Sequence, residues 1–388
     1  MNDNFDSIND EITPTSTNQS RISKKFLWIT IGILLILILL SISISLPIIM
    51  RKKKNTLHTT TTTTTTITTT TKAAITTEKL SFISMSNNNY PKWNLNFSIV
   101  AGGNGYGNDL DQVSLPLGFY IDDDNQTIYI TNYNSDRVVG WKFGEKSGKI
   151  VAGGNGPGHG FNQLEDPSDV TVDKKNDLLI ICDQGNKRVV QWSRQNQTDP
   201  QIIIPEIKCN GVTIDNNGDI YVSEGETHSV KQFKQGETKG RIVAGGHGCG
   251  YESNQLNDPT HVFVDKQYSI YVSDYKYGRV TKWMKNAKEG IVVSKELNAD
   301  SGLPWSSYPS AMAVDHFGNV YVSDYRTIEI VRWSEGSKEG YTVMDGGGFN
   351  RPPNLFDGPA AISLDGEGNL YVADTQKDQI VKFDVDLN

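Results

Sequence analysis

From residue 95 to the end of the chain, short apolar runs alternate with polar positions and no helical period is sustained. The runs come in sets of four. The first run of each set ends in Asp, the second follows a tight turn, the third ends in an aromatic residue, and the fourth reads IVAG or a similar sequence. The Asp residues recur at intervals of 51, 42, 50, 50 and 50: Asp122, Asp173, Asp215, Asp265, Asp315 and Asp365. Four short strands per repeat predict an all-β, six-bladed β-propeller.

The two ends of this region predict how the ring closes. The sixth set reaches its third strand at Phe383, and its fourth strand would start beyond the last residue. An IVAG run at residues 99–102 stands alone before the first set. We therefore expect this N-terminal strand to complete the last blade and to cover an edge that would otherwise be exposed.

Two further features recur at fixed places in the sets. The third strands end in an aromatic residue that we expect to pack between blades: Trp141, Trp192, Phe233, Trp283, Trp333 and Phe383. In three sets a Gly follows the first-strand Asp by three residues, which suits a left-handed turn that the Asp caps: Gly218, Gly318 and Gly368. Tyr268 occupies that position in the fourth set, and we expect a different turn there.

The pattern P-x-x-V-x-V-D-x-x-G-x-[IVL]-Y-V-x-D-x-x-x-x-R-V-x-x-[WF] resembles the NHL repeat, over roughly residues 95–388. The best copies are Asp166–Trp192 and Asp258–Trp283. The third, fifth and sixth copies replace the repeat's Arg, and we expect these changes to affect surface ion pairs: Ser229, Glu329 and Gln379. The resemblance implies a propeller that binds proteins, ligands or RNA, or that occasionally acts as an enzyme.

The N-terminal part of the chain has a different composition. Phe26–Leu46 contains no charged residue and, at about 1.5 Å per residue, is long enough to cross a bilayer core of about 30 Å. A cleaved signal peptide is the alternative, but its apolar region would be shorter. Fifteen of the 22 residues from Thr56 to Thr77 are Thr. We predict a disordered cytoplasmic tail at 1–25, a signal-anchor transmembrane helix at 26–49, a basic and Thr-rich disordered stalk at 50–92, and the propeller at 93–388.

The orientation in the membrane depends on opposing signals. Arg51, Lys52, Lys53 and Lys54 outnumber the basic residues on the other side of the span, which favours a cytosolic C-terminus. The Thr tract, typical of an O-glycosylated stalk, and three glycosylation sequons favour the opposite orientation. The sequons begin at Asn96, Asn125 and Asn196. We expect a single-pass type II protein of the plasma membrane whose C-terminal domain is extracellular and whose lipid contact is residues 26–49.

The net charge of the propeller region and the positions of its histidines disfavour two classes of function. Residues 90–388 carry 28 Lys and Arg against 40 Asp and Glu, a net charge of −12, which disfavours nucleic acid. A lyase propeller of similar architecture holds zinc with three His around its channel. The matching positions here, which we place at the starts of the first strands, contain one His: Gly118, Asp169, Gly211, His261, Ala311 and Ala361.

We therefore expect no cofactor and no catalytic residues, and predict a binding module for an extracellular protein, peptide or glycan. A propeller enzyme of the lyase or lactone-hydrolase type, with a metal in its channel, is the alternative. The candidate ligand-binding residues lie near the starts of first strands: Asp169, His261, Trp305 and Tyr308.

Three cysteines complete the candidate chemistry. Cys209 and Cys249 both lie in segments that lead into first strands of neighbouring blades, so an extracellular disulfide between them is predicted. Cys182 lies inside an apolar strand, and we interpret it as a buried free thiol.

Overall fold

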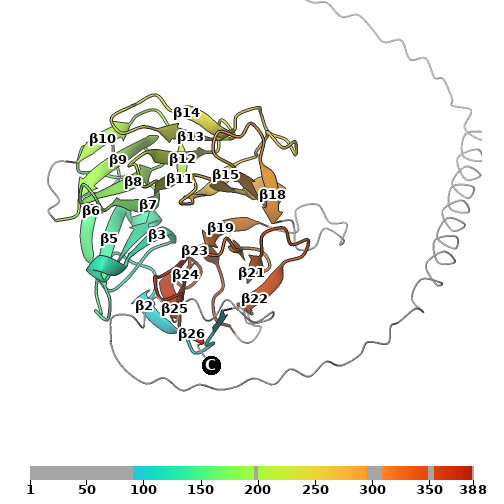
Figure 1. Ribbon diagram of the computed structural model, residues 1–388. Coiled ribbons are helices and arrows are strands. Elements are labelled where there is room, and N and C mark those ends of the chain that lie inside the picture. Colours follow the sequence, from blue (N-terminus) through green and yellow to red (C-terminus); the bar gives the residue numbers. More distant parts are fainter. Residues whose placement is uncertain (1–90, 196–199, 295–307, 348–353, 387–388) are drawn as a thin grey trace, which may run out of the picture. The chain divides into compact units, whose positions relative to one another are not determined.

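A computed structural model describes residues 91–195, 200–294, 308–347 and 354–386. Six four-stranded antiparallel sheets form the blades of a ring (Figure 1). In each blade the first strand is innermost and contacts the first strands of both neighbouring blades, so that β3, β7, β11, β15, β19 and β23 surround the axis. The predicted six-bladed propeller is confirmed. The predicted segments at 1–25 and 26–49 lie outside the described residues, as does the predicted stalk at 50–92 except for Pro91 and Lys92, and Lys92 belongs to a strand.

Blades 1 to 3 follow the chain in order. Blade 1 contains β3 (Pro116–Asp122), β4 (Thr127–Asn132), β5 (Arg137–Lys142) and β6 (Lys149–Gly153), with the 3-10 turns η1 (Asp123–Asn125) and η2 (Tyr133–Ser135). Blade 2 contains β7 (Pro167–Asp173), β8 (Leu178–Asp183), β9 (Arg188–Ser193) and β10 (Gln201–Ile204). Blade 3 contains β11 (Cys209–Ile214), β12 (Ile220–Glu224), β13 (Ser229–Phe233) and β14 (Arg241–Gly245).

Blades 4 to 6 complete the ring. Blade 4 contains β15 (Pro259–Val264), β16 (Ile270–Asp274), the 3-10 turn η3 (Tyr275–Tyr277), β17 (Arg279–Trp283) and β18 (Ile291–Ser294). Blade 5 contains β19 (Pro309–Val314), β20 (Val320–Asp324), β21 (Glu329–Trp333) and β22 (Tyr341–Asp345). Blade 6 contains β23 (Pro359–Leu364), β24 (Leu370–Asp374), β25 (Gln379–Phe383) and the N-terminal β2 (Ser98–Gly102).

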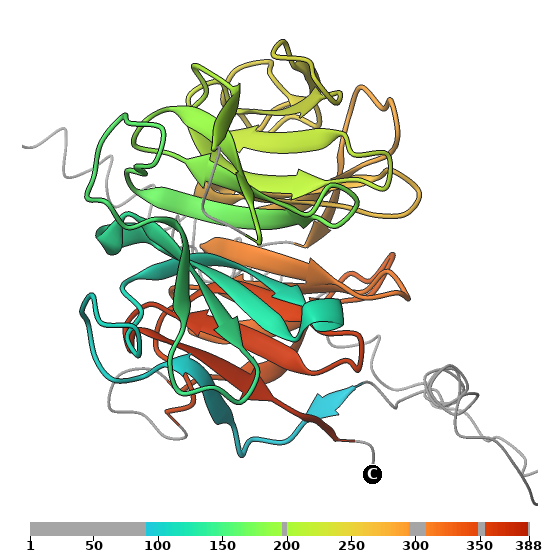
Figure 2. The same ribbon diagram turned by 90° about the vertical axis from the view of Figure 1, so that its left-hand side faces the viewer.

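The N-terminal strand closes the ring as predicted. In the antiparallel register of β2 and β25, Ser98 lies opposite Lys382 and Gly102 opposite Gln379. A second closure, which the sequence analysis did not foresee, joins β1 (Lys92–Trp93) to β26 (Val385–Asp386). Figure 2 shows both N-terminal strands beside the C-terminal ones. Trp93 is buried, and its indole donates a hydrogen bond to the Gly368 carbonyl at 3.0 Å.

The core lies between the blades. The third-strand aromatics Trp141, Trp192, Phe233, Trp283, Trp333 and Phe383 are all buried, at most 5% exposed, which confirms their predicted packing role. The middle strands are buried on both faces because each sheet is covered by a blade on either side. The fourth strands are partly exposed and carry apolar residues such as Ile242 on the outer rim.

The first-strand Asp residues cap turns, as predicted. Asp265 accepts hydrogen bonds from the amides of Gln267 and Ser269 through Oδ1. The expectation of a different turn at Tyr268 is wrong. Its φ is 64°, and its amide donates to the Asp265 carbonyl, as the Gly318 amide donates to the Asp315 carbonyl in blade 5. Tyr268 therefore accepts the left-handed conformation in which its counterparts are glycine.

The arginines of the repeat are buried, so the expectation of surface ion pairs is corrected. Each blade is joined to the next by a connector between its fourth strand and the following first strand, such as residues 154–166 before blade 2. The guanidinium of Arg188 bonds to Asp183 and donates to the carbonyls of His159, Gly160 and Gln163 in that connector. Arg137 and Arg279 bond to the connectors that lead into blades 1 and 4 in the same way. Each of these Gly-rich connectors thus precedes a blade that has kept its Arg.

Candidate functional site

A cavity of about 480 Å³ lies on the ring axis and is lined by residues of all six blades. Its lining comes from the starts of first strands and from the residues that follow second strands. Both places lie at the end of the ring where the connectors enter, which we call the connector face. Equivalent positions in the six blades therefore line the cavity, and the residue at each position differs from blade to blade.

The inner lining is one residue per blade, immediately after the first residue of the first strand. These residues are Leu117, Ser168, Asn210, Thr260, Ser310 and Ala360. Five of the six first strands begin with Pro, and in every blade the pairing of the first and second strands shifts register just after this start. A bulge of this kind re-aims side chains, here toward the axis.

The predicted lining is consequently off by one residue in most blades. Of the six positions proposed from the sequence, only Asp169 and His261 line the cavity. Gly118 and Gly211 instead allow neighbouring first strands to approach closely, since a Cβ on Gly118 would lie 2.5 Å from Asp169 Oδ1 and one on Gly211 2.4 Å from the Thr260 carbonyl. Ala311 and Ala361 are buried in the core.

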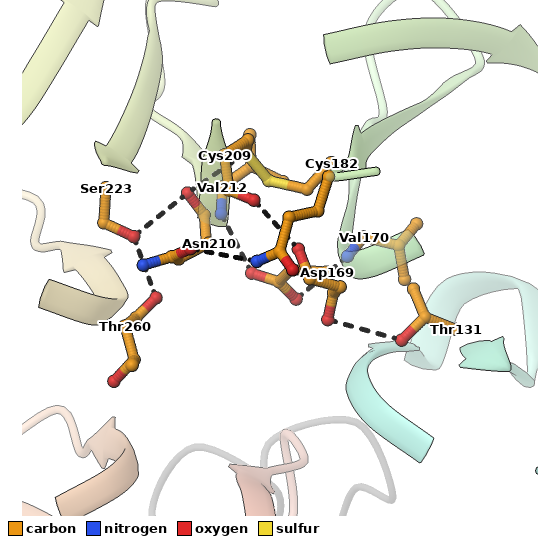
Figure 3. Close-up of a disulfide and its surroundings, with 12 residues drawn as sticks. Thr131, Asp169, Val170, Cys182, Cys209, Asn210, Val212, Ser223 and Thr260 are labelled. Atoms are coloured by element: carbon orange, nitrogen blue, oxygen red, sulfur yellow. Dashed lines mark hydrogen bonds between the residues drawn. A yellow bond between two sulfur atoms is a disulfide. The ribbon is translucent and has the colours of Figure 1, made fainter. Parts of the chain in front are cut away.

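Asp169 joins two blades at the wall of the cavity. Its Oδ1 accepts from the Val170 amide and its Oδ2 from the Val212 amide in β11, both at 2.9 Å (Figure 3). The side chain is buried, and this burial raises the pKa of the Asp169 carboxyl to about 7, although both hydrogen bonds favour the charged form. The residue therefore holds the seam between blades 2 and 3 while it lines the cavity.

His261 contributes a neutral imidazole. Burial lowers its pKa to about 4, so the ring is uncharged at neutral pH. Its side chain makes no hydrogen bond to any residue in the part of the chain that the structure describes. A neutral imidazole offers one donor and one acceptor, and here both are available to a ligand.

A disulfide lies behind this wall and corrects two predictions. Cys209 is bonded to Cys182, not to Cys249, and Cys182 is therefore not a free thiol. Both half-cystines are fully buried, with Cα atoms 5.3 Å apart, and they join β8 of blade 2 to β11 of blade 3 (Figure 3). Cys249 is exposed in the connector before blade 4.

Amide side chains that the sequence analysis missed complete this wall. Asn210 donates from Nδ2 to the Pro259 carbonyl at 2.9 Å, and its Oδ1 accepts from Gln184 Nε2 at 2.9 Å. Gln184 directly follows the Asp that ends the second strand, as do Tyr275, Tyr325 and Thr375 in other blades. Their fixed position after that Asp is the signal that could have identified them.

Tyrosine rings border the cavity on the side of blades 4 and 5. Tyr275 and Tyr325 line it, and the predicted candidate Tyr308 packs on Tyr275 with ring centroids 5.2 Å apart without lining the cavity itself. Gln376 Nε2 donates to the Tyr325 hydroxyl at 2.7 Å. Trp305, the remaining candidate, lies outside the described residues.

The described ranges contain no group of three or more His, Cys, Asp or Glu placed to hold a metal ion. No helix within them is long and apolar enough to cross a bilayer. Asn96 and Asn125 are exposed, and Asn125 Nδ2 donates to Asp122 Oδ2 at 2.8 Å. Asn196 lies outside the described residues, and glycosylation at the three sites stays a prediction.

A model of a known protein family also matches the chain. The NHL repeat model matches residues 208–233, which cover the first three strands of blade 3. The match falls on neither of the two copies that look best by eye, which lie in blades 2 and 4. No curated protein sequence matches the chain.

Solved structures of low sequence identity share the fold. A protein of unknown function from Bacteroides thetaiotaomicron is 17% identical with a TM-score of 0.58, over 75% of this chain and 76% of its own. An auxiliary nutrient binding protein from the same bacterium is 13% identical with a TM-score of 0.56, over 74% and 76%. A gluconolactonase from Xanthomonas campestris is 13% identical with a TM-score of 0.52, over 71% and 88%. At such identities the likeness establishes the fold alone.

Proposed function

We propose that this six-bladed β-propeller of the NHL-repeat type is a single-pass membrane protein that binds an extracellular protein, peptide or glycan in its axial cavity. The observation that carries this proposal is the lining of the cavity. Amide, hydroxyl, imidazole and ammonium groups from blades 2 to 6 converge there beside two tyrosine rings, and Leu115 and Leu117 of blade 1 complete the lining. A pocket with several hydrogen-bonding groups and aromatic rings suits a polar ligand such as a sugar unit or a peptide loop.

The size and preorganisation of the site support a binding role. At about 480 Å³ the cavity falls within the range of roughly 300–1,000 Å³ that is usual for ligand pockets. Asn210 and Gln184 are held by hydrogen bonds within the protein, so that little side-chain freedom is lost when a ligand arrives. Lys208 and His261 supply further groups that a ligand can engage.

Two features support display outside the cell. The apolar segment Phe26–Leu46, followed by a Thr-rich stretch, suits an anchor and a stalk. The buried Cys182–Cys209 disulfide suits an oxidising compartment, because cytosolic thiols are kept reduced. Residues 1–25 would then lie in the cytosol.

The topology is tested by glycosidase digestion of the full-length chain expressed in mammalian cells. We expect N-glycosidase F to reduce the apparent mass, and Asn196→Gln to remove part of that shift. An epitope tag fused to the N-terminus should be protected from protease added to intact cells, because the tag would lie in the cytosol. An unglycosylated chain whose C-terminal domain is protected from protease would contradict the extracellular orientation.

Ligand binding is tested with the full-length chain in a non-ionic detergent on glycan and peptide arrays. Ala360→Trp places an indole in the cavity, whereas Thr342→Trp places the same group on the exposed strand β22 and serves as the control. We expect Ala360→Trp to abolish the binding seen with wild type, and Thr342→Trp to retain it. Equal binding by all three chains would contradict the assignment to the cavity.

A propeller enzyme with a metal in the channel is the second candidate. Asp169 and His261 both line the cavity, and one structural neighbour is a gluconolactonase. Metal analysis of the purified full-length chain separates the two functions. Stoichiometric zinc or calcium that is lost in Asp169→Asn would favour the enzyme.

A further inference from the structure

A second pocket, of about 250 Å³, lies between blades 3 and 4 and shares no residue with the axial cavity. It is lined by the hairpins that join first to second strands and third to fourth strands, which lie at the end of the ring opposite the connector face. We call it the seam pocket. Its lining includes four cationic residues: Lys234, Arg241, Lys285 and Lys288.

The positive charge of the seam pocket is not neutralised by ion pairs. None of its four cations pairs with a carboxylate of another described residue. The two acidic residues of the lining accept hydrogen bonds from neutral groups instead. Asp215 accepts from backbone amides and from the Tyr221 hydroxyl, and Asp219 accepts from Gln232 Nε2 at 2.8 Å. Four cations against two carboxylates give the lining a net charge of +2, a local positive charge that attracts an anion although the domain as a whole carries −12.

The next seam of the same ring provides an internal comparison. Between blades 4 and 5, Lys282 of β17 pairs with Glu335 of the following hairpin at 3.4 Å. At the corresponding positions between blades 3 and 4, the strand residue is Gln232 and the hairpin residue is Lys285. The ion pair that crosses the seam between blades 4 and 5 therefore has no counterpart here, where the two positions carry a neutral amide and an ammonium group without a carboxylate partner among the described residues.

Tyr268 forms a wall of the seam pocket. Lys285 Nζ lies 4.0 Å from the centroid of its ring, and Asn217 Nδ2 donates to its hydroxyl at 3.0 Å. A tyrosine at φ 64° is strained relative to the glycine that blades 3, 5 and 6 use in this turn. The ring restrains Lys285 by a cation–π contact and leaves the rest of its ammonium group accessible.

We propose that the seam pocket is an anion-binding site for a sulfate or phosphate ester group. Several cations around one pocket suit an anion with three or more oxygen atoms, because each oxygen can accept from a different donor. Arg241 is held in position by the bond from its Nε to Gln232 Oε1 at 2.7 Å. Lys234 and Lys288 are exposed and border the pocket on two different hairpins.

The repeat itself supplies the test variants. Lys285→Glu introduces the residue that blade 5 has at this position, and Tyr268→Gly introduces the residue that three other blades have in this turn. Both changes are therefore compatible with the fold. Lys338→Glu makes the same change of charge on the exposed third-to-fourth-strand hairpin of blade 5 and serves as the matched control.

The measurement is isothermal titration of the full-length chain in a non-ionic detergent at 50 mM salt. The probes are sucrose octasulfate with sucrose as its uncharged control, and inositol hexakisphosphate with inositol as its control. We expect wild type and Lys338→Glu to bind at least one polyanion, and the stronger of the two probes identifies the ester. Lys285→Glu should weaken binding at least tenfold, and Tyr268→Gly several-fold.

Two results would overturn the proposal: no binding of either polyanion to wild type, or an equal loss in Lys285→Glu and Lys338→Glu. The axial-cavity variant Ala360→Trp should bind the polyanion as wild type does. This variant separates the two sites, so that the seam pocket can be refuted while the axial cavity stands, and the reverse.

Discussion

The buried disulfide between blades 2 and 3 gives a prediction with a calculable size. The double substitution Cys182→Ala with Cys209→Ala removes the bond without leaving a reactive thiol. The two residues are 27 positions apart, and closing a loop of that length lowers the conformational entropy of the unfolded chain by an amount worth about 3.5 kcal/mol at 25 °C. Loss of two fully buried sulfur atoms adds to this cost.

The assay is urea unfolding of the full-length chain in detergent, followed by tryptophan fluorescence. With a slope of about 3 kcal/mol per molar urea, a loss of about 3.5 kcal/mol lowers the midpoint by about 1 M. Cys249→Ala is the control, and we expect it to leave the midpoint unchanged because its thiol is exposed. Alkylation of the native wild type under non-reducing conditions should label Cys249 alone.

Two outcomes would overturn the predicted role of the disulfide. A double variant that unfolds at the wild-type midpoint would mean that no bond constrains the unfolded chain. A midpoint shift as large in Cys249→Ala as in the double variant, with peptide mapping that joins Cys209 to Cys249, would restore the pairing that the sequence alone suggested.

Three further predictions concern closure, connectors and pH. Deletion of residues 91–102 removes both closing strands and exposes the edge of β25, so we expect a loss of monomer on size-exclusion chromatography. Arg188→Ala leaves a buried Asp183 carboxylate unpaired and should cost about 3–5 kcal/mol in urea unfolding, against no change for Lys338→Ala. The pKa of Asp169 is about 7 in the folded protein and about 3.9 in the unfolded chain, so the folded state holds the proton more tightly. The stability that this proton confers is therefore complete below about pH 4 and declines, by up to about 4 kcal/mol, as the pH rises to 7. In Asp169→Asn this decline in the free energy of unfolding between pH 4 and pH 7 should be absent. The same decline in wild type and variant would contradict the prediction.

The blades could be predicted because their signal is repeated. Alternating apolar residues that end in Asp and in an aromatic recur six times, and a repeat that cannot bury its own faces must stack on its neighbours. The lone IVAG run at residues 99–102 fixed the closure for the same reason, because one strand was missing at the other end. The short pairing of β1 with β26 has only two residues in each strand and leaves no such pattern.

The candidate site was predicted less well because it depends on local departures from the repeat. The register shift after Pro259 brings Thr260 into the lining beside His261. The alternation of apolar and polar residues did not predict a bulge at this position. The disulfide depends on how closely β8 and β11 approach across a seam, which spacing along the chain does not reveal. Tyr268 was expected to change its turn, but the hydrogen bonds to Asp265 outweigh its preference against a left-handed conformation.

Hydrogen exchange distinguishes a ligand bound in the axial cavity from one bound elsewhere on the propeller. The full-length chain would be compared with and without the glycan or peptide that binds best on the arrays. We expect slower exchange at the amides around the starts of the first strands, at residues 115–118, 257–261 and 308–311, which border the cavity. Protection confined to the outer strands, such as β14 and β22, with no change at these amides, would contradict it.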